Sequence, residues 1–200
     1  MPHQIVNVGY KSTNFWAVSA GRSRLLVDLG WPGTFGALKA QLDRMDIPLA
    51  EITHGLATHY HLDHAGAAQE LKLAGMRLVV LDVQQRAING MLDFAKPADR
   101  YTAITLHDNT IISCANSRAF LATLSLAGEV VHTPGHSDDS VSLLLDDGAV
   151  FTGDLTWPTF ITPEEADVTT ASWALLRAKG ASTVYAGHGP VRPMPAVGDG

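Results

Sequence analysis

The sequence predicts a sandwich in which two β-sheets pack face to face and helices cover the outside. The 200 residues divide into two halves, and in each half apolar segments of strand type precede segments of helical periodicity. A sheet with one apolar face must bury that face against another layer, so two packed sheets satisfy both halves. Because no linker separates the halves, we expect one α+β domain over residues 1–192, followed by an unstructured tail over 193–200.

The first half is expected to contain most of one sheet. Its strands share Val, Leu and aromatic residues between turn residues, and we place them at 4–8, 14–19, 24–28, 52–58 and 76–81. Its helices show apolar residues at helical spacing, for example Phe35, Leu38, Leu42 and Met45, and we place them at 35–45, 64–73 and 83–92.

The second half is expected to supply the other sheet and one long helix. Its strands are predicted at 104–113, 119–126, 129–133, 140–145, 149–152 and 183–186. The turn Asp146-Asp147-Gly148 predicts a hairpin. A helix is predicted over 163–179, with Pro163 in its first turn and Gly180 after its end.

Composition indicates a globular protein and gives little support for a nucleic-acid partner. Hydrophobic residues make up 46% of the chain and charged residues 17%, so a sizeable core is expected. The net charge is −6 and no basic stretch stands out, which argues against nucleic acid. The lone Cys114 cannot form an internal disulfide and is expected to be a buried small hydrophobe. No signal peptide and no apolar run of about 20 residues is found, so a cytoplasmic protein without membrane contact is expected.

Four metal-binding side chains lie within six positions of the segment 58–66, in the pattern H-x-H-x-D-H. On an extended backbone alternate side chains share a face, so His59 and His61 point the same way. On a helix, residues two apart diverge by about 200° and could not share an ion. Asp63 and His64 are adjacent in a turn, point elsewhere and indicate a second metal position. Imidazole nitrogen and carboxylate oxygen are the usual non-sulfur ligands of zinc and similar ions.

Three later segments each place a further metal-binding side chain at the end of a predicted strand. His136 follows Thr-Pro-Gly, Asp154 follows Phe-Thr-Gly, and His188 lies between two glycines. Glycine permits the tight or positive-φ turn that exposes a side chain at a sheet edge. Any one of these residues alone would be interpreted as an ordinary loop residue, but together with the first motif they are metal-binding candidates that are hard to dismiss.

This series of motifs resembles the metallo-β-lactamase superfamily over nearly the whole chain, in the segments THYHLDH, TPGHS, FTGDL and AGHGP. The resemblance implies a four-layer αββα sandwich of mixed sheets with the site along one edge. It also implies two divalent metal ions, most consistent with Zn²⁺, with Fe or Mn as alternatives. The implied ligands are His59, His61 and His136 for one ion, Asp63, His64 and His188 for the other, and Asp154 as a bridge between them.

In the resembling enzymes a metal-bridging hydroxide attacks a carbonyl carbon, and Asp63 would orient this nucleophile or carry a proton. Asp28 lies in a Val-Asp-Leu-Gly segment that resembles the family's early strand-ending aspartate. We expect Asp28 and Thr58 to hydrogen-bond the ligand histidines. Trp157 and Phe160 follow Asp154 and are candidates for the walls of the substrate pocket.

Several subgroups of the superfamily fit less well. Asp154 stands where some β-lactamases have cysteine, so β-lactam hydrolysis is expected to be weak at most. His61 stands where oxygen-reducing diiron members have glutamate. Glyoxalase II-like enzymes carry a helical extension, whereas twelve residues follow His188. The expected function is therefore hydrolysis of an ester, thioester or lactone.

Three alternatives remain open at this stage. One is a persulfide dioxygenase that uses a single iron bound by His59, His136 and Asp154. Another is a promiscuous β-lactam hydrolase, and the third is a binding protein without catalysis on the same scaffold. The expected partner is a small-molecule substrate, with a homodimer as the one protein assembly considered.

Overall fold

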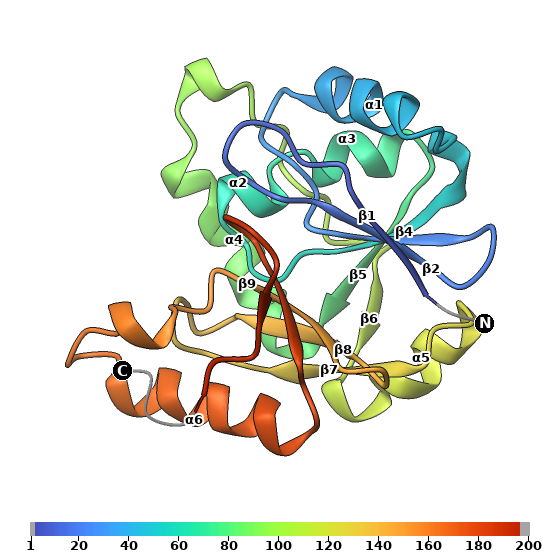
Figure 1. Cartoon of the computed structure of the whole chain (residues 1–200). Coiled ribbons are helices and arrows are strands. Elements are labelled where there is room, and N and C mark those ends of the chain that lie inside the picture. The colour runs from blue at the N-terminus through green and yellow to red at the C-terminus, as the bar shows by residue number, and fades with distance from the viewer. Residues whose placement is uncertain (1–2, 197–200) are drawn as a thin grey trace.

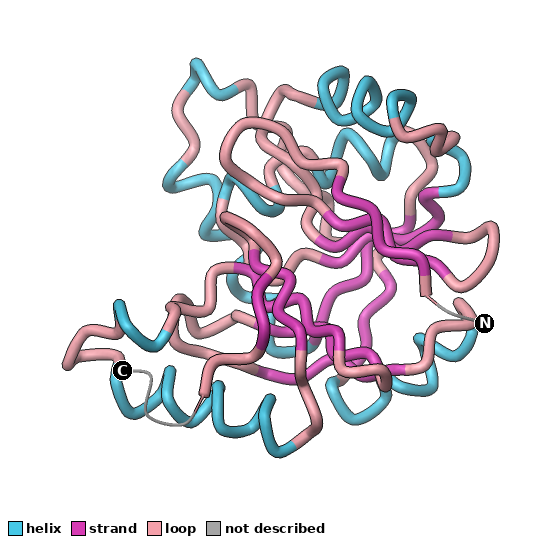
Figure 2. The backbone as a smooth tube through the Cα atoms, viewed as in Figure 1, coloured by secondary structure: helices cyan, strands magenta, loops and turns pink. Residues whose placement is uncertain are grey.

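Two β-sheets face each other across the middle of the molecule, and helices cover the outer faces of both (Figure 1 and Figure 2). The computed structural model describes residues 3–196. One sheet has the strand order β1-β2-β3-β4-β5-β6 and the other β11-β10-β9-β8-β7. Each sheet contains antiparallel and parallel pairs, such as β2 with β3 and β3 with β4 in the first. The predicted α+β sandwich of two mixed sheets is confirmed.

The elements have the following bounds. The first sheet consists of β1 (Gln4–Asn7), β2 (Trp16–Ser19), β3 (Arg24–Val27), β4 (Ile52–Leu56), β5 (Arg77–Leu81) and β6 (Thr110–Ile112). The second sheet consists of β7 (Gly128–His132), β8 (Val141–Leu145), β9 (Ala149–Gly153), β10 (Thr183–Ala186) and β11 (Arg192–Pro193). The helices are α1 (Phe35–Arg44), α2 (Leu62–Ala65), α3 (Ala68–Leu73), α4 (Gln85–Phe94), α5 (Ser117–Thr123) and α6 (Ala166–Ala178).

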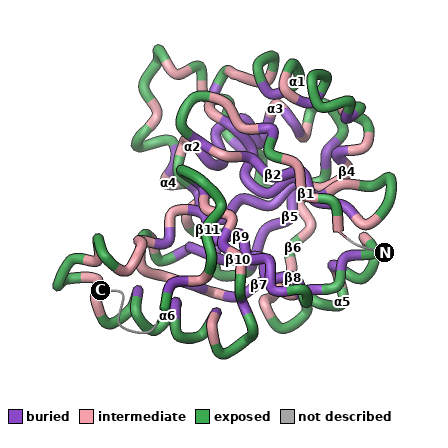
Figure 3. The backbone as a smooth tube through the Cα atoms, in the orientation of Figure 1, coloured by how far each residue is buried: buried purple, intermediate pink, exposed green. Residues whose placement is uncertain are grey.

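Strand residues alternate between two apolar layers, as the period of a β-strand requires. In β5, Leu78 and Val80 pack against α1, α3 and α4, whereas Val79 and Leu81 point into the space between the sheets. In β8, Leu143 points between the sheets and its neighbour Leu144 packs against α6. The molecule therefore has three buried apolar layers separating four layers of secondary structure, and the buried segments form its centre (Figure 3).

The stretch between the two halves differs from the prediction. The strand predicted over 104–113 shrinks to β6, because a loop precedes it in which Asp108 has a φ of 63° and the Lys72 ammonium group donates to the Thr105 and His107 carbonyls. The strand predicted over 119–126 is wrong, since this segment forms α5. Ser117 and Leu121, one helical turn apart, are its buried residues.

Two further boundaries differ. The helix predicted over 64–73 is divided into α2 and α3 at Gly66, whose backbone packs directly on Pro32. The predicted unstructured tail is ordered at its start: Pro193 pairs with Thr183 in β11 and the Met194 amide donates to the Ser182 carbonyl. Residues 197–200 of that tail lie outside the described residues. Among residues 3–196, no helix has both the length and the apolar character needed to cross a membrane.

Candidate metal centre

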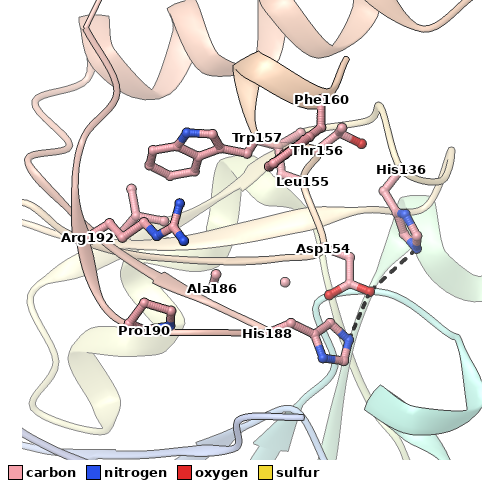
Figure 4. A pocket seen from close by; sticks show the side chains of 12 residues that line it. His136, Asp154, Leu155, Thr156, Trp157, Phe160, Ala186, His188, Pro190 and Arg192 are labelled. Carbon is pink, nitrogen blue, oxygen red and sulfur yellow. Dashed lines mark ion pairs between the residues drawn. The ribbon is translucent and has the colours of Figure 1, made fainter. Parts of the chain in front are cut away.

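The seven predicted donors meet at one edge of the sandwich, where strands of both sheets end. His59 and His61 follow β4, and Asp63 and His64 lie in the short helix α2. The other three donors come from the second sheet and follow β7, β9 and β10: His136, Asp154 and His188. Figure 4 shows these three side chains directed toward one another.

The first group of donors consists of His59, His61 and His136, whose candidate ligand atoms all lie within 4.8 Å of one another. His136 Nε2 is 3.0 Å from His61 Nδ1. The ring of His59 lies with its centroid 4.5 Å from that of His61 and 4.8 Å from that of His136. Three imidazole nitrogens converge here, as the alternation along the extended segment predicted for the first two.

The second group consists of Asp63, His64, Asp154 and His188. Asp63 Oδ2 is 3.3 Å from His64 Nε2 and 3.2 Å from His188 Nε2. Asp154 places Oδ1 3.2 Å from His64 Nε2 and Oδ2 3.4 Å from His188 Nε2. The same Oδ2 is 3.7 Å from His136 Nε2, so the Asp154 carboxylate faces both groups.

The donor chemistry fits divalent metal ions. His59 Nε2, His64 Nε2 and Asp154 Oδ1 are buried atoms without a hydrogen-bond partner in the described part of the chain. A buried polar atom without a partner costs roughly 1–3 kcal/mol, and a metal ion coordinated to it would remove this cost. Imidazole and carboxylate together suit zinc, iron and manganese, whereas thiolate donors are absent from both groups.

Asp28 and Thr58 support the donor histidines from behind. Asp28 accepts hydrogen bonds from the backbone amide of Thr58 (2.8 Å) and its hydroxyl (2.9 Å) through Oδ1. Its Oδ2 lies 2.9 Å from His64 Nδ1, and the Thr58 hydroxyl lies 3.2 Å from His59 Nδ1. When a histidine donates through Nδ1, its Nε2 is left free to act as a ligand. The backbone of Asp28 is left-handed, with a φ of 63°. This conformation costs a non-glycine residue about 1 kcal/mol or more.

The loop between β1 and β2 contributes contacts that the sequence did not indicate. His188 Nδ1 is 2.6 Å from the Ser12 carbonyl oxygen, and the Thr13 hydroxyl donates to Asp63 Oδ2 at 3.4 Å. Ser12 acts through its backbone alone, so no side-chain pattern could identify it. These two contacts orient donors of the second group from the opposite side to Asp28.

A second set of missed contacts fixes the chain before α2. The buried Gln84 amide donates to the carbonyls of Ala57, Thr58 and Asp139, which joins β4, β8 and the start of α4. The Asp139 carboxylate accepts from the Tyr60 amide at 2.8 Å. Asp139 is therefore a buried residue that supports the backbone of the first motif.

Glycine is required at one position where the two sheets approach closely. A Cβ on Gly187 would lie 2.5 Å from His64 Cε1 and 2.6 Å from Asp154 Oδ1. Both distances are well below van der Waals contact. Gly187 therefore allows β10 to bring His188 beside the donors of the second group.

The electrostatics of the metal-free site are dominated by the mixture of imidazoles and carboxylates. Burial lowers the pKa of His59 well below its usual value, and the neighbouring His64 lowers it further. For His64, burial acts in the same direction but is outweighed by Asp28, Asp154 and Asp63, so its pKa is raised well above the usual value. Burial acts to raise the pKa of Asp154, but contact with His64 outweighs it and lowers the pKa to about 2.

A cavity of about 390 Å³ opens beside the donors (Figure 4). His136, Asp154 and His188 form part of its wall, so a molecule bound at this end of the cavity can contact both donor groups. Trp157 and Phe160, predicted as pocket walls, both line it. The remaining lining includes small residues of β10 and the side chain of Arg192, which the sequence analysis did not single out.

The family model for the metallo-β-lactamase superfamily matches residues 8–188, which is most of the chain and includes all seven donors. The chain belongs to the metallo-β-lactamase superfamily. The resemblance drawn from the four motifs is confirmed, and the family fold agrees with the two-sheet sandwich.

Relatives of this superfamily chain carry different names. It is 29% identical over 187 residues to the thioesterase pkgB of Emericella nidulans, which covers 90% of this chain and 46% of the relative. It is 30% identical over 145 residues to the beta-lactamase-like protein 2 homolog of Drosophila melanogaster, covering 72% and 47% respectively. The chain therefore spans about half the length of these relatives.

Solved structures share the fold at lower identity. The BLEG-1 B3 metallo-beta-lactamase has a TM-score of 0.70 and 22% identity, with 96% of this chain and 94% of that chain covered. TTHA1623, solved in a di-iron-bound form, has a TM-score of 0.72 and 24% identity. The match covers 96% of this chain and 94% of TTHA1623. At this identity the likeness concerns the fold alone.

Proposed function

We propose that this chain is a dinuclear metal-dependent hydrolase that cleaves an ester, thioester or lactone. The observation that carries the proposal is the pair of donor groups that face one carboxylate, Asp154, beside a cavity of substrate size. Family membership supports it, as does a relative named a thioesterase.

In this proposal His59, His61 and His136 hold one ion, Asp63, His64 and His188 hold the other, and Asp154 bridges them. Bound divalent ions lower the pKa of a coordinated water to about 7 and polarise a carbonyl oxygen. Zinc is the proposed metal because it accepts this set of nitrogen and oxygen donors. The same donors accept iron or manganese, and the di-iron form of TTHA1623 makes iron the first alternative to test.

The protein's own groups orient the reaction. Asp63 is held by the Thr13 hydroxyl and lies between His64 and His188, where its free oxygen can orient the nucleophile or accept its proton. Trp157 and Phe160 line the cavity beside Asp154 and give a bound acyl compound an apolar surface. A small acyl compound fits a cavity of about 390 Å³.

Elemental analysis combined with a substrate panel tests the proposal. The protein purified with zinc, manganese or iron should carry close to two ions per chain and hydrolyse at least one class among lactones, thioesters and aryl esters. Asp154→Ala should lower the metal content and remove nearly all activity, whereas the matched His107→Ala, an exposed histidine outside both donor groups, should change neither. No more than one ion per chain under all loading conditions, or a fully active Asp154→Ala variant, would refute the dinuclear site.

The same experiment separates the iron-dependent persulfide dioxygenase. That activity needs one iron and three donors, and it consumes oxygen. Both donor groups of this chain are complete, which favours two ions. One iron per chain with oxygen uptake in the presence of a persulfide would replace the hydrolase by the dioxygenase.

A further inference from the structure

Arg192 brings a positive charge into the wall of the cavity that contains the metal donors. It lies in β11, where its backbone pairs with Val184 of β10. Its guanidinium carbon is 5.2 Å from the centroid of the Trp157 ring. Figure 4 shows Arg192 and His136 at opposite sides of the cavity, with Asp154 and His188 between them.

In the described part of the chain the Arg192 guanidinium group has no acidic partner. Within residues 3–196 no carboxylate lies within ion-pair distance of Arg192 and no side-chain hydrogen bond of it is formed, although other arginines, such as Arg24 and Arg118, pair with acids. The chain carries a net charge of −6, so acidic side chains are not scarce. An arginine with five free N–H donors in a cavity is suited to a planar anion from solution.

Arg192 is exposed, and its guanidinium group stacks on an aromatic pair that is itself packed in place. Trp157, on which it stacks, packs edge-on against Trp173 with ring centroids 5.5 Å apart, and Trp173 Nε1 donates to the Thr156 carbonyl at 2.8 Å. After β11, the guanidinium of Arg177 donates to the Pro195 carbonyl at 2.7 Å. The stacking contact favours the orientation of the guanidinium group along the Trp157 ring and the cavity wall.

Arg192 is the one Lys or Arg in the described lining of the two cavities beside the donors. The main cavity contains no other Lys or Arg among its described lining residues. A second cavity of about 310 Å³ on the side of His61 and Asp63 has apolar walls that include Met91 and Phe94 and contains no Lys or Arg in its described lining. Recognition of a negative charge on a substrate can therefore be assigned to one residue.

We infer that Arg192 binds a carboxylate group of the substrate and thereby orients its ester, thioester or lactone carbonyl toward Asp154 and His188. This inference rests on the proposed hydrolase function. A guanidinium fork matches a carboxylate through two parallel N–H···O bonds. Arg192 is the one Lys or Arg among the described lining residues, and its single positive charge matches a carboxylate monoanion more closely than a phosphate dianion. The aromatic faces of Trp157 and Phe160 suit an apolar body between the carboxylate and the carbonyl group.

Paired substrates and paired ligands test the inference. The first experiment compares the hydrolysis of 4-carboxyphenyl acetate with that of its neutral analogue, 4-carbamoylphenyl acetate. The second compares the binding of benzoate with that of benzamide, both measured by calorimetry. The proteins are the metal-loaded wild type, Arg192→Met, Arg192→Lys and Arg22→Met. The last removes the same charge from an exposed position in the turn between β2 and β3.

Arg192→Met should lower kcat/KM for the carboxylate ester by about 10- to 100-fold, and weaken benzoate binding similarly, because a hydrogen bond to a charged group is lost. The neutral ester and benzamide should change by less than about threefold. Arg192→Lys should be intermediate, since ammonium cannot form the paired bonds. Arg22→Met should behave like the wild type.

Equal losses on both esters, or unchanged benzoate binding in Arg192→Met, would overturn the inference. Tighter binding of phenyl phosphate than of benzoate by tenfold or more would overturn the choice of carboxylate. If the wild type hydrolyses none of the substrate classes, the proposed function fails, while the benzoate comparison still decides the role of Arg192.

Discussion

Replacing Asp28 by Asn should weaken metal binding while leaving the fold intact. An asparagine side chain keeps one oxygen, which can still accept from the Thr58 amide and hydroxyl at the present 2.8 and 2.9 Å. Its NH₂ group, however, then faces His64 Nδ1, which lies 2.9 Å from Asp28 Oδ2. Two donors cannot share that contact, so His64 must carry its proton on Nε2 instead. An Nε2 that carries a proton cannot ligate a metal ion.

The expected loss of metal affinity follows from the role of Asp28 as the group that supports His64. Loss of the supporting contact of a ligand histidine typically costs 10- to 100-fold in metal affinity, and we expect this loss for the ion held by His64. Stability of the metal-free protein should fall by about 3 kcal/mol, because the buried His64 loses the charged partner that raises its pKa. Asp28→Ala should cost about 3 kcal/mol or more, since the Thr58 amide and His64 Nδ1 are then both buried without an acceptor.

Competition with a chromophoric chelator measures the affinity of each ion, and urea unfolding of the metal-free protein measures stability. Asp108→Asn is the matched control, because Asp108 has the same φ of 63° as Asp28 but is exposed and far from the donors. Asparagine tolerates this left-handed conformation well. If Asp28→Asn binds two ions as tightly as Asp108→Asn, the assignment of Asp28 as the group that sets the proton position on His64 is wrong.

Three further outcomes are expected. Gly187→Ala should reduce the bound metal to about one ion or fewer per chain in elemental analysis, because its methyl group overlaps a donor histidine and a donor carboxylate of the second group. Gln84→Leu should lower the free energy of unfolding in urea by about 2–4 kcal/mol, since three backbone carbonyls lose their buried donor. A loss smaller than that of the surface control Gln85→Leu would contradict this expectation. The Lys179 ammonium group lowers the pKa of Glu129. Glu129→Gln should therefore lower the free energy of unfolding by about 0.5 kcal/mol at pH 7. In thermal melts over a pH series, this difference should disappear as the pH falls through the lowered pKa. A difference that grows on acidification would have the wrong sign for this ion pair.

The donor set was accessible from the sequence because its chemistry is concentrated in side chains with a fixed spacing. The period of an extended strand is enough to place His59 and His61 on one face, and the structure brings them together with His136. Strand-ending glycines likewise pointed to Asp154 and His188, which lie in the second group. Their action as metal ligands stays a prediction, which the metal analysis tests.

Other features depended on contacts that no local pattern contains. The segment 119–126 has strand-like composition, but burial of Ser117 and Leu121 against β7 selects the helix α5. The support of His188 by the Ser12 carbonyl involves backbone 176 positions away in the chain. The predicted domain ended at Arg192. The strand β11 that positions Arg192 is only two residues long, too short to give a strand pattern in the sequence. Tertiary packing decided each of these cases.

The division of the donors between the two sheets ties metal affinity to sheet packing. Trp16 of β2 donates from Nε1 to the Ala186 carbonyl at 3.3 Å, and its ring packs edge-on against Phe151, three residues before Asp154. A change in the packing of this aromatic contact moves the ends of β9 and β10 relative to β4, and therefore moves the second donor group relative to the first. Conversely, ions that bind only the assembled donors stabilise the fold by mass action, by about 4 kcal/mol when the free ion is 1,000-fold above its Kd. Substitutions at the sheet interface should consequently change metal affinity without contacting the ions, so that affinity and stability vary together along a series of such variants.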